Sequence, residues 1–271
     1  MNKVAVLGSG VMGSRIACHF ANTGHEVILL DISPRKLNDQ EKAKGLELNN
    51  PLVKNRIVND ALQSSLKSNP SPIYSKSFAS RISTGNFEDD LSKIKDCDWV
   101  IEAIIEDLKI KQGLFEQVEQ HRKAGSLITT NTSGIPINML AEGRSEDFQK
   151  HFFGTHFFNP PRYLSLLEII SGPKTDPEAI DFMMHYGEKY LGKKSILAKD
   201  TPAFIANRLA IYAILSIFRH TEELGLSVTD VDKLTGTLIG RAKSATFRTG
   251  DVVGIDTLVR VQGHSSHLPA R

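Results

Sequence analysis

The sequence is poor in the residues that dominate disulfide-rich, membrane-spanning or nucleic-acid-binding chains. Its 271 residues include 2 cysteines, Cys18 and Cys97, which have neither CxxC nor metal-site spacing, so we expect buried thiols in a reducing compartment and no metal site. No apolar run is long enough to span a bilayer. The 33 basic and 31 acidic residues leave a net charge of +2, which argues against a general nucleic-acid or acidic-membrane surface. No secretory signal or arginine-rich leader precedes the first apolar run, which makes the cytoplasm the expected location.

What the chain does contain, close to its start, is a glycine-rich turn directly after an apolar run. The run Val4–Leu7 predicts a strand, and Gly8, Gly10 and Gly13 follow it. In a dinucleotide site the first glycine permits a tight turn, the second lets the backbone approach a pyrophosphate, and the third lets the next helix pack closely on the sheet. A helix predicted over residues 11–22 would present its amino terminus, with unpaired N–H groups, to the phosphates.

An acidic residue ends the second apolar run. Asp31 follows Val27–Leu30 and lies 18 positions after Gly13, a spacing typical of a ribose-binding carboxylate. Such a carboxylate accepts hydrogen bonds from the ribose hydroxyls and repels a 2′-phosphate, so the sequence favours NAD over NADP, a preference that Arg35 would soften. The alternative is a glycine turn with no ligand, which does not account for the combination of strand, turn, helix and carboxylate.

Apolar runs alternate with helix-like periods through most of the chain, which is the rhythm of a Rossmann-type, doubly wound and mostly parallel α/β sheet. The strand-like runs are Lys3–Leu7, Glu26–Leu30, Asp98–Ile104, Ser126–Thr130, Gly154–Phe158 and Leu164–Ile170. A polar excursion near residues 34–80, too long for a simple turn, predicts a helical appendage with a helix over Pro34–Leu48 and an irregular tip. We assign residues 1–199 to this NAD-binding domain.

The composition changes near Lys199, and residues 200–271 predict a smaller, all-helical domain. Its first helix is apolar around much of its circumference, so it needs cover on several sides. The predicted helices cover Phe204–Phe218, which Gly225 ends, then Asp230–Ile239 and Ile255–Val261.

Acidic residues follow the third predicted strand, at the edge where open α/β sheets bind ligands. In the stretch Glu102–Lys111, Glu106 and Asp107 lie where this strand gives way to a helix. They either contact the cofactor or cap the helix and match its dipole, and the two interpretations are about equally supported.

A second polar stretch, Asn131–Gly134, directly follows the next strand. Its hydroxyls and amide would project into the cofactor cleft. The competing interpretation makes Thr132 or Ser133 the N-cap of a short helix beginning near Pro136. Both interpretations are compatible with one another.

One histidine and one glutamate interrupt neighbouring apolar runs, where an unpaired polar group is costly. These residues are His156 and Glu168, and they can meet if the two runs pair. A carboxylate partner orients the imidazole, fixes its tautomer and stabilises the imidazolium that forms when it takes a proton. A lone histidine would be better explained as a satisfied core residue, but the glutamate favours a catalytic pair.

Asn207 is a polar residue on the predicted apolar helix of the second domain, just after the join between the domains. A buried amide needs hydrogen-bond partners, so Asn207 either ties this helix to a loop or contacts the substrate.

The motifs GSGVMG, VIEAIIEDLKIK, NTSG, HFFNP and DTPAFIANR together make the chain similar to the 3-hydroxyacyl-CoA dehydrogenase family, from Lys3 to about Thr257. The resemblance implies cofactor contacts at Gly8, Gly10, Val11, Met12, Gly13, Asp31, Glu106, Lys111, Ser133 and Asn159. It implies a catalytic pair of His156 and Glu168, with Ser133 and Asn207 as substrate-side hydrogen-bonding residues.

The resemblance also gives the appendage a use, because in this family such an appendage clasps the coenzyme A part of the substrate. Lys54, Arg56 and Lys67 are the candidate phosphate partners, although each taken singly also fits a solvated charged face. The chain departs from the family at Ala203, where glycine is frequent. Residues 240–254 resemble the form fused to an enoyl-CoA hydratase, and the helical part is shorter than the resemblance implies.

The implied activity is NAD-dependent oxidation of (S)-3-hydroxyacyl-CoA to 3-ketoacyl-CoA, as in fatty acid β-oxidation, with His156 as general base oriented by Glu168. The implied partners are the acyl-CoA substrate, a second copy of the chain bound through the helical domain, and a fused or associated enoyl-CoA hydratase. Two alternatives stay open: a related two-domain dehydrogenase of a small 3-hydroxy acid, and a non-catalytic NAD-binding module.

Overall fold

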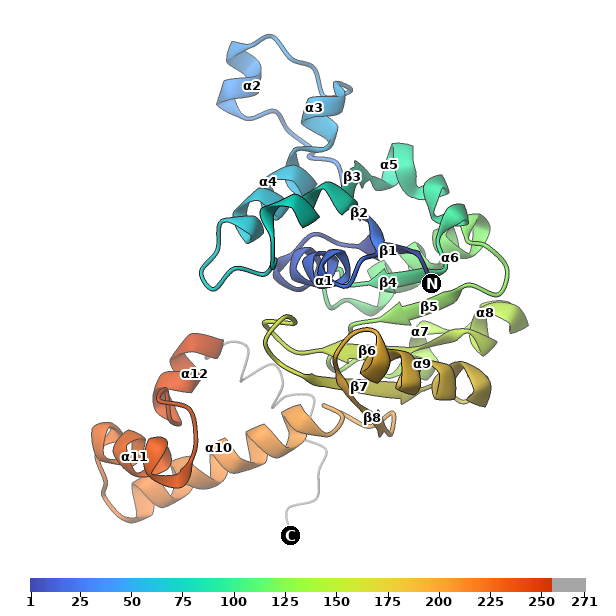
Figure 1. The fold of residues 1–271 in the computed structure, drawn as a ribbon. Helices are drawn as coiled ribbons and strands as arrows, with labels where there is room; N and C mark the ends of the chain where they lie inside the picture. The colour runs from blue at the N-terminus through green and yellow to red at the C-terminus, as the bar shows by residue number, and fades with distance from the viewer. Residues whose placement is uncertain (255–271) are drawn as a thin grey trace. The chain divides into compact units, whose positions relative to one another are not determined.

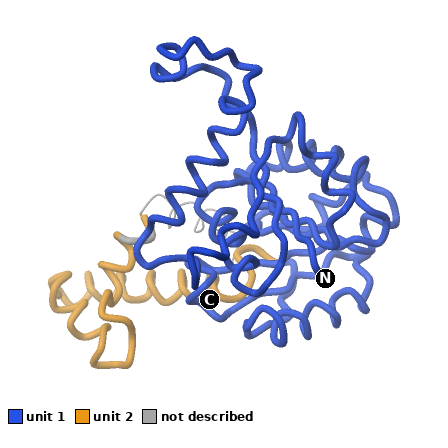
Figure 2. Tube along the Cα trace, turned by 45° about the horizontal axis from the view of Figure 1, so that its top comes forward, with its two compact units in different colours: residues 1–200 blue, residues 201–271 orange. Residues whose placement is uncertain are grey.

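The computed structural model describes residues 1–254. The chain divides into two compact units, and the boundary in the sequence falls between Asp200 and Thr201 (Figure 2). Unit 1 is an α/β unit, and the described part of unit 2 is helical. Within the described residues, no helix combines the length and apolar character needed to cross a membrane.

Unit 1 is built on an eight-stranded sheet with the order β3-β2-β1-β4-β5-β6-β7-β8 (Figure 1). The strands are β1 Lys3–Leu7, β2 Glu26–Asp31, β3 Ile82–Asn86, β4 Trp99–Glu102, β5 Leu127–Thr130, β6 Phe152–Phe157, β7 Leu166–Ser171 and β8 Lys194–Ala198. Every neighbouring pair is parallel except β6 and β7, which are antiparallel. The predicted mostly parallel, Rossmann-type sheet is therefore confirmed.

Helices connect consecutive strands except β6 and β7, which a loop joins (Figure 1). The α-helices of unit 1 are α1 Val11–Asn22, α2 Asp39–Ala43, α3 Pro51–Lys54, α4 Arg56–Leu66, α5 Phe87–Asp90, α6 Leu108–His121, α7 Ile137–Leu140, α8 Glu146–Lys150 and α9 Pro177–Lys189, with short 3₁₀ segments η1 Lys76–Arg81 and η2 Leu91–Asp96.

The core of unit 1 lies between the sheet and helices such as α1 and α9. Phe20 of α1 contacts Trp99 of β4 edge to face, with ring centroids 5.0 Å apart, and Phe157 of β6 at 6.2 Å. The only tryptophan of the chain also satisfies its indole N–H, which donates to Thr129 Oγ1 at 2.9 Å. The central strands are buried on both faces, which explains their nearly unbroken apolar sequences.

The sequence prediction missed the two strands at the edges of the sheet. The β3 sequence Ile-Ser-Thr-Gly-Asn and the β8 sequence Lys-Ser-Ile-Leu-Ala bury only part of their side chains. An edge strand pairs on one side only, so it does not need the continuous apolar run that marked the central strands.

The appendage is helical, but its first helix is much shorter than the predicted Pro34–Leu48. Asn38 and Glu41 form a capping box that fixes the start of α2. Gly45, with φ at 65°, follows the last turn and ends the helix. In Figure 1, α2 and α3 project away from the sheet.

Unit 2 begins with α10 Ala206–Glu223, followed by α11 Val228–Thr235, the 3₁₀ segment η3 Thr237–Ile239 and α12 Phe247–Val253. The helix predicted from Phe204 starts two residues later, because Ala203 and Phe204 have φ angles of 62° and 46°. The left-handed backbone at Ala203 is a conformation that favours glycine.

Helix α12 was not predicted from the sequence. Its amino terminus is capped from a distant position by Asp232, whose carboxylate accepts from the backbone N–H groups of residues 246–248 at 2.7 to 3.1 Å. The helix predicted over Ile255–Val261 lies outside the described residues.

Alanine substitutions at two glycines of the first turn should differ in their effect on stability. A Cβ at Gly13 would lie 1.8 Å from the carbonyl oxygen of Gly8, whereas a Cβ at Gly10 meets nothing within 4 Å. We expect Gly13→Ala to lower the free energy of unfolding by about 1–3 kcal/mol. Gly10→Ala should change it by less than about 1 kcal/mol. Urea denaturation without cofactor measures both, and equal losses would contradict the steric argument.

Candidate active site

The glycine turn between β1 and α1 has the geometry of a phosphate cradle. Gly8 takes a φ of 101° and donates its N–H to Leu30 O at 2.7 Å, which brings the turn beside the end of β2. No side chain caps the start of α1 at Gly10. The free space at Gly10 and the uncapped helix N–H groups both suit a pyrophosphate, so these residues fit a bound dinucleotide.

Asp31 lies at the end of β2, where the prediction placed a ribose-binding carboxylate. Its Oδ2 accepts from Ser9 N at 2.6 Å and Ser9 Oγ at 2.5 Å, and its Oδ1 accepts from Ile32 N at 2.7 Å. The carboxylate therefore also fixes the glycine turn to β2. The role of Ser9 was not predicted, because only the glycines of the motif carry an obvious constraint.

Buried charges lie at the carboxyl end of β4. The Lys111 ammonium is 1% exposed and contacts Glu102 Oε1 at 2.6 Å and Glu106 Oε2 at 3.3 Å. Burial raises the pKa of the Glu102 carboxyl, although Lys111 and its hydrogen bonds act in the opposite direction. Lys111 thus pairs with both glutamates, and its contact with the cofactor stays a prediction. No pattern in the sequence marked Glu102 as a site residue.

Glu106 holds the loop that follows β5. Its Oε1 accepts from the Thr132 hydroxyl, from Ser133 N at 3.0 Å and from Gly134 N at 3.2 Å. Burial alone would raise the pKa of this carboxyl, but Lys111 and the donors of the loop bring the pKa below its usual value. A charged Glu106 therefore fixes the backbone that carries Ser133.

Two capping interpretations need correction. Helix α6 is capped by Asp107, which accepts from Ile110 N at 3.0 Å, and not by Glu106. Neither Thr132 nor Ser133 caps α7, whose first N–H groups are bound by the carboxylate of Asp200, 3.0 Å from Ile137 N and 3.2 Å from Asn138 N. The sequence could not reveal a cap supplied from 63 positions away.

His156 and Glu168 meet across the antiparallel strands. They are direct partners in the β6–β7 register, and His156 Nδ1 lies 2.8 Å from Glu168 Oε2. Both side chains are buried, and the Ser133 hydroxyl lies 3.1 Å from His156 Nε2. With the Nδ1 proton donated to Glu168, Nε2 is left as an acceptor facing Ser133, which is the arrangement of a general base.

A loop of residues 158–165, here called the β6–β7 loop, joins these two strands. Asn159, a predicted cofactor contact, accepts from Arg15 Nη1 of α1 at 2.5 Å. The buried Lys193 ammonium donates to Pro161 O and, at 2.9 Å, to Leu164 O. Burial lowers the pKa of Lys193 to about 8. Nothing in the sequence distinguishes a lysine next to the edge strand β8 as a residue that holds this loop.

The three basic residues predicted to hold the coenzyme A phosphates are placed differently. Lys54 pairs with Glu88 and Asp89, at 3.1 and 2.7 Å, and Arg56 pairs with Glu41 at 3.0 Å. Carboxylates therefore neutralise both charges in this structure, and the assignment of Lys54 and Arg56 to the coenzyme A phosphates stays a prediction. Lys67 follows α4 and is exposed, and its assignment stays a prediction.

A small cavity of about 220 Å³ lies between the glycine turn and α4. It is lined by Ser9, Gly10, Val11, Ser14, Arg15, Ala61, Ser64, Ser65 and Ser68. Hydroxyls, a guanidinium and a helix amino terminus are donors suited to phosphate oxygens. The serines at the end of α4 and just after it, Ser64, Ser65 and Ser68, were the available signal in the sequence.

Asn207 belongs to unit 2, in the first turn of α10, where it is half-buried. Its predicted contact with substrate stays a prediction. No cluster of three or more histidine, cysteine or acidic side chains among residues 1–254 is arranged to hold a metal ion.

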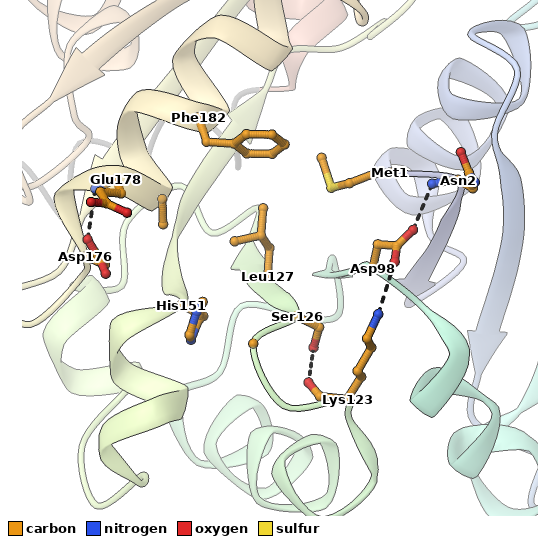
Figure 3. Close-up of a pocket in the computed structure, with 12 residues that line it drawn as sticks. Met1, Asn2, Asp98, Lys123, Ser126, Leu127, His151, Asp176, Glu178 and Phe182 are labelled. Atoms are coloured by element: carbon orange, nitrogen blue, oxygen red, sulfur yellow. Dashed lines mark hydrogen bonds and ion pairs between the residues drawn. The ribbon is translucent and has the colours of Figure 1, made fainter.

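A second cavity, of about 610 Å³, lies at the amino ends of the strands (Figure 3). Phe182 and Met1 face one another across it, and Asp98 contacts Lys123 at one side. None of the predicted site residues lines this cavity. The acid–base residues and the glycine turn both lie at the opposite, carboxyl edge of the parallel strands, where ligands of this fold bind.

Lys193 should make the free energy of unfolding rise with pH. Its pKa of about 8 in the folded chain lies below the ordinary value of 10.5, so the folded state loses this proton first. Stability is therefore gained as pH rises from about 8 to about 10.5. We expect the free energy of unfolding of the native chain to rise relative to that of Lys193→Met across this window.

Urea denaturation at several pH values measures this difference. Lys194→Met removes the exposed neighbouring lysine. The difference in free energy of unfolding between the native chain and this control should not change with pH across the same window. A difference between the native chain and Lys193→Met that stays constant from pH 8 to 10.5 would contradict the argument.

Comparison with known proteins agrees with this geometry. Residues 3–201 match the family described as "3-hydroxyacyl-CoA dehydrogenase, NAD binding domain". A Bacillus subtilis protein named "Probable 3-hydroxyacyl-CoA dehydrogenase" is 51% identical over 96% of this chain, and a Deinococcus radiodurans protein of the same name is 45% identical over 96%. The chain spans 33% of the first relative and 71% of the second.

The fold agrees as well. The crystal structure of (S)-3-hydroxybutyryl-CoA dehydrogenase from Ralstonia eutropha has a TM-score of 0.74 and 26% identity, covering 98% of this chain and 87% of that one. The glycine turn, the strand order and the matched sequence all lead to one conclusion. The chain belongs to the 3-hydroxyacyl-CoA dehydrogenase family, and its first 200 residues contain that family's NAD-binding domain.

Proposed function

We propose that the protein oxidises (S)-3-hydroxyacyl-CoA to 3-ketoacyl-CoA with reduction of NAD, as in fatty acid β-oxidation. The observation that carries the proposal is the chain of contacts from Ser133 Oγ to His156 Nε2 at 3.1 Å and from His156 Nδ1 to Glu168 at 2.8 Å. This acid–base unit lies at the same sheet edge as the glycine turn. It has the parts that removal of a hydroxyl proton requires.

In this mechanism His156 Nε2 takes the proton of the substrate 3-hydroxyl. When bound, NAD supplies the acceptor for the hydride that leaves C3, and the oxygen and C3 form the new carbonyl bond. Glu168 accepts the Nδ1–H of the resulting imidazolium and balances its charge. Ser133, held in place through Glu106, orients the substrate oxygen beside Nε2.

The coenzyme A part of the substrate is assigned to the appendage side. The cavity between α4 and the glycine turn supports this, because Arg15 and the serines of α4 offer donors for phosphate oxygens. Relatives include a protein named "Putative fatty acid oxidation complex trifunctional enzyme" from Rickettsia felis, which is 36% identical over 95% of this chain. A hydratase partner, a second copy of the chain and a substrate contact by Asn207 belong to the same proposal.

Substrate choice separates this proposal from its alternatives. We expect NADH to be oxidised by acetoacetyl-CoA and not by free acetoacetate, because the coenzyme A moiety supplies binding energy remote from the reacting carbon. Loss of NADH absorbance at 340 nm follows the reaction. Preference for the free acid would indicate a dehydrogenase of small hydroxy acids, and NADH binding without turnover of either compound would indicate a non-catalytic module.

Substitution of the acid–base pair should reduce turnover without removing cofactor binding. We expect His156→Gln to lower kcat by about 10² to 10⁴, the usual contribution of a general base, and Glu168→Gln to lower kcat and change its pH profile. NADH affinity, measured by fluorescence titration, should stay close to that of the native protein.

The exposed residues His185 and Glu188 offer matched controls of the same residue types on α9. His185→Gln and Glu188→Gln should leave kcat unchanged. Full activity of His156→Gln would remove this histidine from the mechanism, and an unaltered pH profile of Glu168→Gln would make the glutamate a purely structural residue.

A further inference from the structure

The β6–β7 loop is fastened to the segment that leads back from the appendage to the sheet. This segment, residues 67–75, follows α4 and precedes η1, and we call it the return segment. Arg162 of the loop donates from Nη1 to Ser71 O at 2.7 Å and to Ile73 O at 3.0 Å. The Tyr163 hydroxyl donates to Ser71 O at 3.0 Å. Two consecutive loop residues therefore bind the same turn of the return segment.

Stacking defines this contact further. The Arg162 guanidinium carbon lies 4.3 Å from the ring centroid of Tyr74 and 5.0 Å from that of Tyr163. No carboxylate of the described residues forms an ion pair with Arg162, so its donors serve the two carbonyls. A planar guanidinium that stacks and binds two acceptors holds both groups in one geometry, which a lysine could not reproduce.

The return segment is also fixed to the core without Arg162. Asn22, at the end of α1, donates from Nδ2 to Pro72 O at 2.9 Å and accepts from Tyr74 N at 2.8 Å. Loss of Arg162 would therefore leave the segment attached to α1. What Arg162 adds is a connection to the loop that joins the strands of His156 and Glu168.

The two ends of this connection belong to different parts of the proposed site. The β6–β7 loop begins two residues after His156 and carries Asn159. The return segment continues from α4 and includes Ser68, which lines the cavity beside the glycine turn. A ligand that binds α4 and this cavity thus contacts a segment that is hydrogen-bonded to the β6–β7 loop.

We propose that Arg162 is a positioning residue that couples binding of the coenzyme A nucleotide near α4 to the placement of the β6–β7 loop, which joins the strands of His156 and Glu168. The inference rests on the proposed function. Binding energy from a remote part of a substrate can be used to orient the reacting groups, and substrates that lack the remote part then lose kcat as well as affinity. Through the hydrogen bonds of Arg162, binding of a ligand at α4 would orient the β6–β7 loop.

The test compares acetoacetyl-CoA with S-acetoacetyl-N-acetylcysteamine, a thioester that has the same reacting group and no nucleotide. For Arg162→Met we expect kcat/KM with acetoacetyl-CoA to fall about tenfold, with kcat contributing to the loss. With the truncated thioester the same variant should stay within about twofold of the native protein, because nothing occupies the α4 side. Tyr163→Phe removes one of the three hydrogen bonds and should give a smaller, parallel effect.

Lys76→Met is the matched control, because it removes an exposed positive charge adjacent to the return segment and leaves the hydrogen bonds of Arg162 in place. It should leave both substrates unaffected. An equal loss of kcat/KM in Lys76→Met would show that positive charge attracts acetoacetyl-CoA and that the Arg162 hydrogen bonds have no special part. Equal loss of both thioesters in Arg162→Met would show a purely structural role, and either result overturns the proposal. If Arg162→Met fails to fold, Arg162→Lys takes its place with the same expected pattern.

The two proposals fail in distinguishable ways. If the native protein turns over neither thioester, the proposed function is contradicted, and the proposed coupling through Arg162 is contradicted as well. Native protein that turns over both thioesters, with no selective loss in the Arg162 variants, contradicts only the coupling.

Discussion

The register of the antiparallel strands β6 and β7 determines both the packing of the core and the chemistry of the site. Side chains alternate between the two faces of a strand, so one register places Glu168 opposite His156 and a slip by one residue would place a leucine or an isoleucine there. A buried imidazole without a polar partner is costly. The large apolar neighbours Phe157, Leu167 and Ile169 are fully buried or nearly so, and their burial fixes the register. The hydrophobic effect therefore positions the acid–base pair.

The second part of the site depends on buried charges. Glu102, Lys111 and Glu106 form a continuous group at the end of β4, and Glu106 fixes the backbone of Ser133. Removing such charges from water costs several kcal/mol per ion unless each is paired and hydrogen-bonded. Here Glu102 also accepts from Thr130 Oγ1 at 2.5 Å and from Ile104 N at 2.7 Å. Because the partners are all present in the free protein, the serine is held in position before any ligand binds.

Features encoded by neighbouring residues were predictable from the sequence, and features made by distant residues were not. The central strands, the glycine turn and the His156–Glu168 contact follow from apolar periodicity, from backbone constraints and from two polar residues in paired apolar runs. Strands β3 and β8 escaped prediction, because an edge strand needs little apolar sequence. The Asp200 cap of α7 joins residues 63 positions apart, and the ion pair of Lys54 with Asp89 joins residues 35 positions apart. No local sequence pattern reveals such contacts.

Cations of unit 1 differ in whether a carboxylate neutralises them. Lys54 and Arg56 of the appendage are neutralised by carboxylates. In contrast, Arg15 and Lys193 bind the β6–β7 loop through amide and carbonyl oxygens, and Arg162 of this loop donates to carbonyl oxygens of the return segment. None of the three pairs with a carboxylate in the described part of the chain. A carbonyl dipole holds a cation in place without cancelling its charge, so these three residues raise the electrostatic potential around the loop. A diphosphate-bearing ligand is attracted by net charge, and the structure retains that charge beside the glycine turn and the acid–base pair.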